Sequence, residues 1–150
     1  LTGTWLSQRC FLALWAVQLG QKALDACIHY ARERKQFGKV IGSFQMIQEK
    51  IVEMAILIET SRLLAYKALS LVDKGIWCPK ETSMAKYYST EAAIQVTSMA
   101  IQIHGSYGLS REYPLEKLLR DARMLTIPDG TTEIQKLIVG REILGIRAFS

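Results

Sequence analysis

The sequence predicts an all-α protein: an antiparallel, up-and-down four-helix bundle with one extra short helix. Apolar residues recur every three or four positions along most of the chain, which is the period of an amphipathic helix. Only three of the 150 residues are proline and ten are glycine, and no stretch alternates apolar and polar residues as a strand would. A chain of this length is long enough for one domain with its own core.

The first helix is expected over about residues 4–33, because its apolar residues keep a three-four spacing and no proline interrupts them. Trp15 and Cys27 lie on this stripe and are most simply core residues. The run breaks in a charged stretch around Gly38. Glycine adopts backbone conformations that other residues resist, so a turn is expected there.

Four further helices are predicted to follow, one of them short. We expect them over about residues 44–74, 80–104, 114–123 and 132–149. Ser43 is expected to cap the second helix, and Gly75 follows its end. Pro114 can start the short helix, since proline is tolerated at the first helical position. Thr132 followed by Gln135 fits a capping box at the start of the last helix.

The three cysteines are widely spaced and odd in number: Cys10, Cys27 and Cys78. We expect buried thiols of an intracellular protein rather than disulfides or zinc ligands. His29 and His104 are the only histidines, so no metal site is expected, and His104 is expected to be packed or solvent-facing.

The formal net charge of +5 has two interpretations. It can reflect a solvated surface with a modest lysine excess, or an anionic partner such as phosphate groups. The uncharged run at residues 10–21 is too short to span a bilayer and no signal peptide is visible, so no membrane partner is expected. The chain begins at Leu1 rather than at methionine, which is typical of a fragment.

A cluster of cations surrounds Phe37 and Gly38: Arg32, Arg34, Lys35 and Lys39. Cations near the C-terminal end of a helix are favourable for the helix dipole alone. The functional alternative is a phosphate clamp, in which the guanidinium of Arg34 grips a diphosphate and Phe37 covers an aromatic ring.

Asp129 lies in the loop before the last helix, within the stretch 127–135. Proline, aspartate, glycine and threonine all favour turns and helix caps, so this stretch can be a helix start and nothing more. A carboxylate on such a loop is also fixed in position without being sealed in a core. If a ligand excluded water from it, its proton affinity would rise, as a general base at neutral pH requires.

Several motifs follow one another along the chain: Tyr30-Ala31-Arg32-Glu33-Arg34-Lys35-Gln36-Phe37-Gly38-Lys39, Phe44-Gln45, Gln102-Ile103-His104-Gly105, Glu112-Tyr113-Pro114, Arg120-Asp121, Asp129-Gly130-Thr131, Ile134-Gln135 and Gly140-Arg141-Glu142. In this order the chain resembles the C-terminal helical domain of the acyl-CoA dehydrogenase family of flavoproteins. The resemblance covers essentially the whole chain.

The resemblance implies FAD as cofactor and an acyl-CoA thioester as substrate. In such enzymes a carboxylate removes the α-proton, the β-hydride passes to the flavin, and electrons leave to an electron-transferring flavoprotein. Members form homodimers or homotetramers, and carry an N-terminal helical domain and a middle β domain that are absent from this chain. The isolated domain is therefore expected to be inactive. A bacterial cytoplasmic location, or the mitochondrial matrix, is expected.

The resemblance also assigns cofactor contacts by position. Arg34, Gln36 and Phe37 would reach the FAD of a neighbouring subunit, with Phe44 and Gln45 nearby. Gln102 and Gly105 would meet that cofactor near its diphosphate and adenosine end. Thr131 and Glu133 would touch the subunit's own flavin.

On the substrate side, the resemblance places Gly130 beside the thioester and Arg9 near the acyl-CoA. The family most often has glutamate where this chain has Asp129. The shorter side chain sets its oxygen roughly an ångström further back, and a misplacement of that size can cost about a hundredfold in rate. Some relatives carry the base just before the arginine matched by Arg9, but Gln8 stands there and cannot serve. Asp129 is therefore the only candidate base.

In having aspartate at this position, the chain resembles certain dehydrogenases of cyclic acyl-CoAs and also nitroalkane oxidases. Ser106 also replaces the second glycine of a family motif. A flavin oxidase on the same scaffold is one alternative. A non-catalytic helical bundle for oligomerisation or nucleic-acid binding is another, although the basic residues are scattered rather than gathered on one helix face.

Overall fold

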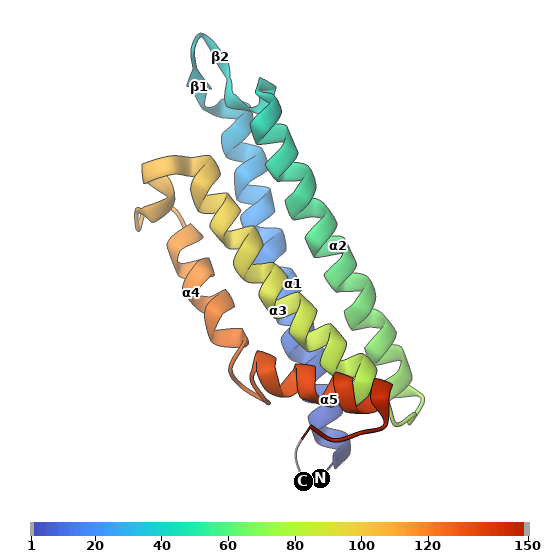
Figure 1. Ribbon diagram of the computed structural model, residues 1–150. Helices are drawn as coiled ribbons and strands as arrows, with labels where there is room; N and C mark the ends of the chain where they lie inside the picture. Colours follow the sequence, from blue (N-terminus) through green and yellow to red (C-terminus); the bar gives the residue numbers. More distant parts are fainter. Residues whose placement is uncertain (1, 149–150) are drawn as a thin grey trace.

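A computed structural model describes residues 2–148 and shows a helical bundle (Figure 1). The helices are α1 Thr2–Glu33, α2 Gln45–Asp73, α3 Pro79–His104, α4 Leu115–Leu125 and α5 Thr132–Leu144. The short elements are the strands β1 Lys35–Gln36 and β2 Lys39–Val40 and the 3₁₀ turns η1 Ile41–Ser43 and η2 Gly105–Leu109. The all-α class is confirmed.

Three long helices form the frame of the bundle. α2 runs antiparallel to α1 and α3, which run in the same direction, and α3 contacts each of the other helices (Figure 1). α4 runs back along α3, and α5 lies across the end of the bundle that holds the start of α1 (Figure 1). Because α3 is the central helix, its side chains can reach both α1 and the α4–α5 segment.

The core between these helices is rich in small residues. Fully or nearly fully buried alanines come from α1, α2, α3 and α4. Small side chains allow helix axes to approach closely, so large residues on the edge of a stripe are pushed outward. The prediction that Trp15 is a core residue is therefore wrong, since its side chain is 52% exposed, whereas Cys27 is fully buried as expected.

Buried threonines on α3 satisfy their hydroxyls locally. Thr90 donates to the carbonyl of Lys86 at 2.9 Å and Thr97 to that of Ala93 at 2.7 Å, each one turn back along the helix. Such back-bonding lets a polar side chain occupy the core without an unpaired donor. α3 can therefore be buried on most sides and still carry polar groups.

The turn predicted around Gly38 is a tight hairpin. Phe37 and Gly38 have φ angles of 51° and 78°, the two consecutive positive values that a type I′ turn needs. β1 and β2 pair antiparallel, with Gln36 opposite Lys39. The sequence predicted this turn but not the strands, because two residues each are too few to show an alternating pattern.

Two helix ends differ from the predictions. Ser43 does not cap α2: the N-cap is Phe44, and the Ser43 hydroxyl donates instead to the carbonyl of Val40 at 2.7 Å. The last helix ends at Leu144 rather than near residue 149. Gly145 adopts the left-handed conformation with φ of 68° and closes the helix there. Across residues 2–148, no helix combines the length and apolarity that crossing a membrane requires.

Candidate active site

The loop that joins α4 to α5, residues 126–131, is here called the acid loop because it carries Asp129. Asp129 has a φ of 53° and Gly130 a φ of 97°. Aspartate is one of the few residues other than glycine that tolerate the left-handed region, yet the conformation is held only when its surroundings impose it. Asp129 is half-buried, and hydrogen bonds from two other helices hold the backbone around it.

Lys86 of α3 is the first of these contacts. Its side chain is fully buried, and its Nζ donates to the carbonyl of Thr126 at 2.9 Å and to the carbonyl of Gly130 at 2.8 Å. Burial lowers the pKa of Lys86 to about 8, and the carboxylate of Asp129 is the strongest influence in the opposite direction. A buried ammonium therefore ties both ends of the acid loop to the central helix.

Gln135 of α5 is the second contact. It is fully buried, and its Nε2 donates to the carbonyl of Asp129 at 2.9 Å and to that of Gly130 at 3.0 Å. The predicted capping box is wrong. The Thr132 hydroxyl donates to the carboxylate of Glu91 on α3, and Gln135 reaches back to loop carbonyls rather than to a free N–H.

Gly130 is required by space as well as by conformation. A Cβ at this position would lie 2.7 Å from Nε2 of Gln135 and 3.1 Å from a methyl carbon of Ile134. Both distances are shorter than side-chain packing normally allows. The residue that the resemblance places beside a thioester is therefore also the residue that lets Gln135 grip the loop.

Positive charge gathers around Asp129. Arg9 of α1 is half-buried, its Nη1 donates to the Ser83 hydroxyl at 3.4 Å, and its Nε is buried without a hydrogen-bond partner. Burial lowers the pKa of Arg9, while the carboxylate of Asp129 raises it and the charge of Arg141 lowers it. The charge of Asp129 thus raises the pKa of both Arg9 and Lys86.

Thr131 and Glu133 lie at the start of α5. Thr131 is the N-cap residue, and its hydroxyl makes a hydrogen bond that holds the pKa of Glu133 below its ordinary value. The structure therefore brings five of the predicted site residues together at the acid-loop end of the bundle. They are Arg9, Asp129, Gly130, Thr131 and Glu133.

The other predicted residues lie at the hairpin end. Four of them, Arg34, Gln36, Gln102 and Gly105, line a hollow of about 260 Å³ where α1 and α3 end. The guanidinium of Arg34 lies over the Tyr107 ring at 5.6 Å. This hollow offers a cation and two side-chain amides, which are donors suited to an anionic group.

Two aromatic rings extend from the same end. Phe37, at the tip of the hairpin, is 92% exposed and meets Phe44 edge to face with ring centroids 6.2 Å apart. Gln45, the first residue of α2, directly follows Phe44. An exposed aromatic side chain of this size offers a ready surface for a partner or a planar ligand.

His104 also lies at the hairpin end and is packed. It is buried, stacks on Tyr30 with ring centroids 4.1 Å apart, and its Nδ1 lies 3.0 Å from the carbonyl of Ala100. Burial lowers its pKa. Of the two predicted alternatives, a packed or a solvent-facing histidine, the structure confirms the packed one.

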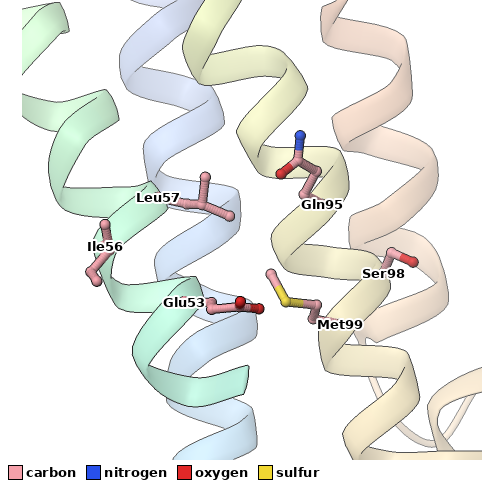
Figure 2. A pocket seen from close by; sticks show the side chains of 6 residues that line it. All are labelled: Glu53, Ile56, Leu57, Gln95, Ser98 and Met99. Atoms are coloured by element: carbon pink, nitrogen blue, oxygen red, sulfur yellow. The ribbon is translucent and has the colours of Figure 1, made fainter. Parts of the chain in front are cut away.

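The two groups of predicted residues lie at opposite ends of the bundle (Figure 1). Arg9 and Arg34 are 25 positions apart along α1 and its end, a span of roughly 38 Å at the helical rise of about 1.5 Å per residue. A groove of about 560 Å³ between α2 and α3 contains neither group (Figure 2). It is lined by Glu53, Ile56, Leu57, Gln95, Ser98 and Met99.

Sequence reasoning missed Lys86 and assigned Gln135 only a capping role. A signal for Lys86 was present, since it lies one turn after Thr82 and one turn before Thr90 on a face of α3 made of small residues. A lysine in the middle of such a face cannot reach solvent easily. Its partners, however, are backbone carbonyls 40 or more residues away, which no local pattern reveals.

The chain is thus an all-α helical bundle that carries a carboxylate on a clamped loop at one end and a hollow suited to an anionic group at the other. Residues 3–144 match the family described as "Acyl-CoA dehydrogenase, C-terminal domain". The chain belongs to this family.

Two curated relatives and one solved structure illustrate the match. The chain is 45% identical over 136 residues to the probable acyl-CoA dehydrogenase YngJ of Bacillus subtilis, covering 91% of this chain and 36% of that protein. It is 43% identical, with the same two coverages, to the caffeyl-CoA reductase–Etf complex subunit CarC of Acetobacterium woodii. The butyryl-CoA dehydrogenase structure from Megasphaera elsdenii superposes with a TM-score of 0.92 at 35% identity, covering 94% of this chain and 37% of that one. The chain thus spans about a third of the length of these relatives.

We predict that Gly130→Ala destabilises the protein by about 1–3 kcal/mol, since alanine is strained at this φ and its Cβ would displace Gln135. Denaturant unfolding followed by circular dichroism measures the change. Gly140→Ala, inside α5 with open space around it, is the matched control and should stabilise by about 0.5–1 kcal/mol. Equal effects of the two substitutions would contradict the clamp around Gly130.

Proposed function

We propose that the complete protein is an FAD-dependent acyl-CoA dehydrogenase in which Asp129 is the general base. The observation that carries this proposal is the acid loop, where two buried side chains, Lys86 and Gln135, fix the backbone that presents one half-buried carboxylate. Membership of the family supports the reaction class. The names of the relatives, an acyl-CoA dehydrogenase and a caffeyl-CoA reductase, support an acyl-CoA thioester as substrate.

In this proposal the chain supplies the proton acceptor and its electrostatic setting. The carboxylate of Asp129 takes the α-proton of the acyl group, whose acidity the neighbouring thioester raises. The carboxylate of Asp129 in turn raises the pKa of Arg9 and of Lys86, against the burial that lowers both. When bound, FAD accepts the hydride from the β-carbon. Covering the site with substrate excludes water and raises the basicity of the carboxylate.

The hairpin end fits the anionic part of FAD. Arg34 offers a guanidinium and Gln36 and Gln102 offer amides to the hollow of about 260 Å³, a donor set suited to a diphosphate. Gly105 has a φ of 61° and open space where a Cβ would stand, so a ligand can approach its backbone closely. Phe37 and Phe44 would cover an aromatic ring, with Gln45 next to them.

We propose a homodimer or homotetramer, which the separation of the two ends supports. We propose that Thr131 and Glu133 contact the subunit's own flavin, while the hairpin end contacts the cofactor of a neighbouring subunit. The roughly 38 Å between Arg9 and Arg34 supports this division, since one cofactor would have to run the length of the bundle to meet both groups. Arg9 and Gly130 would hold the acyl-CoA at the acid-loop end.

We predict that Asp129→Asn in the full-length flavoprotein retains FAD but slows α,β-desaturation by about 10²–10⁴-fold, the usual contribution of a general base. Flavin bleaching by acyl-CoA without oxygen measures the rate across straight, branched and cyclic acyl groups. Asp121→Asn, which alters the exposed pair with Lys117 on α4, is the matched control and should be as active as the wild type. Wild-type bleaching by Asp129→Asn would refute the role of this carboxylate.

We predict that Arg34→Met weakens FAD binding about 10–100-fold, because a hydrogen bond to a charged group contributes about 1.5–3 kcal/mol. Titration of the apoprotein with FAD, followed by flavin fluorescence, gives the dissociation constant. Arg32→Met is the matched control: Arg32 is exposed and does not line the hollow. Equal affinities of the two variants would remove Arg34 from the cofactor site.

The electron acceptor separates the proposed dehydrogenase from a flavin oxidase. One relative is named as a subunit of a reductase–Etf complex, which supports an electron-transferring flavoprotein as acceptor. We predict that the reduced protein reoxidises slowly in air and rapidly with an electron-transferring flavoprotein, as stopped-flow absorbance of the flavin can show. Rapid reoxidation in air with formation of peroxide would instead identify an oxidase.

A further inference from the structure

We propose that Lys86 is a positioning residue that aims the Asp129 carboxylate by holding the backbone of the acid loop. This inference rests on the proposed function, in which Asp129 is the base. It assigns a task in the reaction to a residue on a different helix, which does not itself touch the reacting atoms.

The hydrogen bonds of Lys86 indicate that its ammonium is buried in order to hold the acid loop. A fully buried ammonium is rare in proteins unless strong partners compensate for its lost hydration. The partners of Lys86 are the carbonyls of Thr126 and Gly130, which stand on either side of Asp129 along the chain. If Lys86 only stabilised the packing of the helices, its ammonium would be expected to bind groups on the helices. Within residues 2–148, its ammonium instead donates only to carbonyls of the acid loop.

Gln135 completes a two-sided clamp. Its amide donates to the same Gly130 carbonyl that Lys86 binds and also to the carbonyl of Asp129. Asp129 is thereby held at a φ of 53°, a conformation that an L-residue leaves when its surroundings allow it. Release of either donor would let the residue relax and move its carboxylate.

The charge state of Lys86 sets the strength of its hydrogen bonds to the loop. The charged groups that act on it are Asp129, Arg9, Glu91 and Glu133, and Asp129 has the largest influence of the four. A protonated Lys86 makes charge-assisted hydrogen bonds to the two loop carbonyls, which are stronger than neutral ones. Loss of the proton near pH 8 weakens these bonds.

The test compares Lys86→Met with Lys80→Met in the full-length flavoprotein. Lys80 lies on the same helix, is partly exposed and pairs with Glu81. We expect Lys86→Met to bleach its flavin about a hundredfold more slowly with saturating acyl-CoA, since a misplacement of about 1 Å costs about that much. FAD content and the dissociation constant of a non-reacting acyl-CoA thioether should stay within threefold of wild type. Lys80→Met should match wild type throughout.

Two further readouts separate positioning from a general structural role. Amide hydrogen exchange should be faster in residues 126–131 of Lys86→Met and unchanged in the rest of the bundle. In the wild type the bleaching rate should fall as the pH rises through about 8, where the lysine loses its proton, and this ionisation should be absent from Lys86→Met. An ionisation that persists in the variant would overturn the proposal.

Bleaching by Lys86→Met within threefold of wild type would also overturn it. If Lys86→Met loses FAD or does not fold, Gln135→Met decides, since it removes the other half of the clamp and leaves the lysine in place. Slowed bleaching with FAD retained supports the clamp, and a wild-type rate or loss of FAD overturns it. Asp129→Asn keeps the two proposals apart: its full activity would refute the base itself, whereas an inactive Asp129→Asn beside an active Lys86→Met would refute only the positioning role.

Discussion

The contact on which the site depends is the pair of hydrogen bonds from the Lys86 ammonium to the carbonyls of Thr126 and Gly130. A charge buried in a protein core is unfavourable unless its hydrogen bonds are satisfied. The acid loop supplies that satisfaction, so the lysine and the loop stabilise each other's position. Asp129 lies between the two bonded carbonyls, and its left-handed backbone is the geometry that lets both point at the lysine.

The packing of the bundle makes this contact possible. Alanines, serines and threonines line the faces of α3, and the threonine hydroxyls bond back to their own helix. Lys86 lies among these small residues, and its Nζ reaches the carbonyls of Thr126 and Gly130. The same close packing explains why the indole of Trp15 lies outside the core.

Periodicity and turn residues predicted the fold well, because both are local properties of the chain. The helices and the turn at Gly38 were placed within a few residues, and Asp129 was recognised on its loop. One cap was missed for a local reason, since the Ser43 hydroxyl donates to the nearby Val40 carbonyl. Thr132 and Lys86, in contrast, bind partners 40 or more residues away. Hydrogen bonds between distant segments leave no periodic trace, so the clamp could be found only from the structure.

The charges at the acid-loop end bear on the proposed reaction. Asp129 acts on both Arg9 and Lys86, while Glu91 and Glu133 also act on Lys86 and Arg141 acts on Arg9. In the proposed reaction, removal of an α-proton would place negative charge on the thioester oxygen as the carboxylate becomes neutral. Cations held in a partly buried site would stabilise that charge without rearranging. The Nε of Arg9 is buried without a hydrogen-bond partner, so in this proposal it is a donor open to a substrate oxygen, while Nη1 of the same side chain donates to Ser83 of α3.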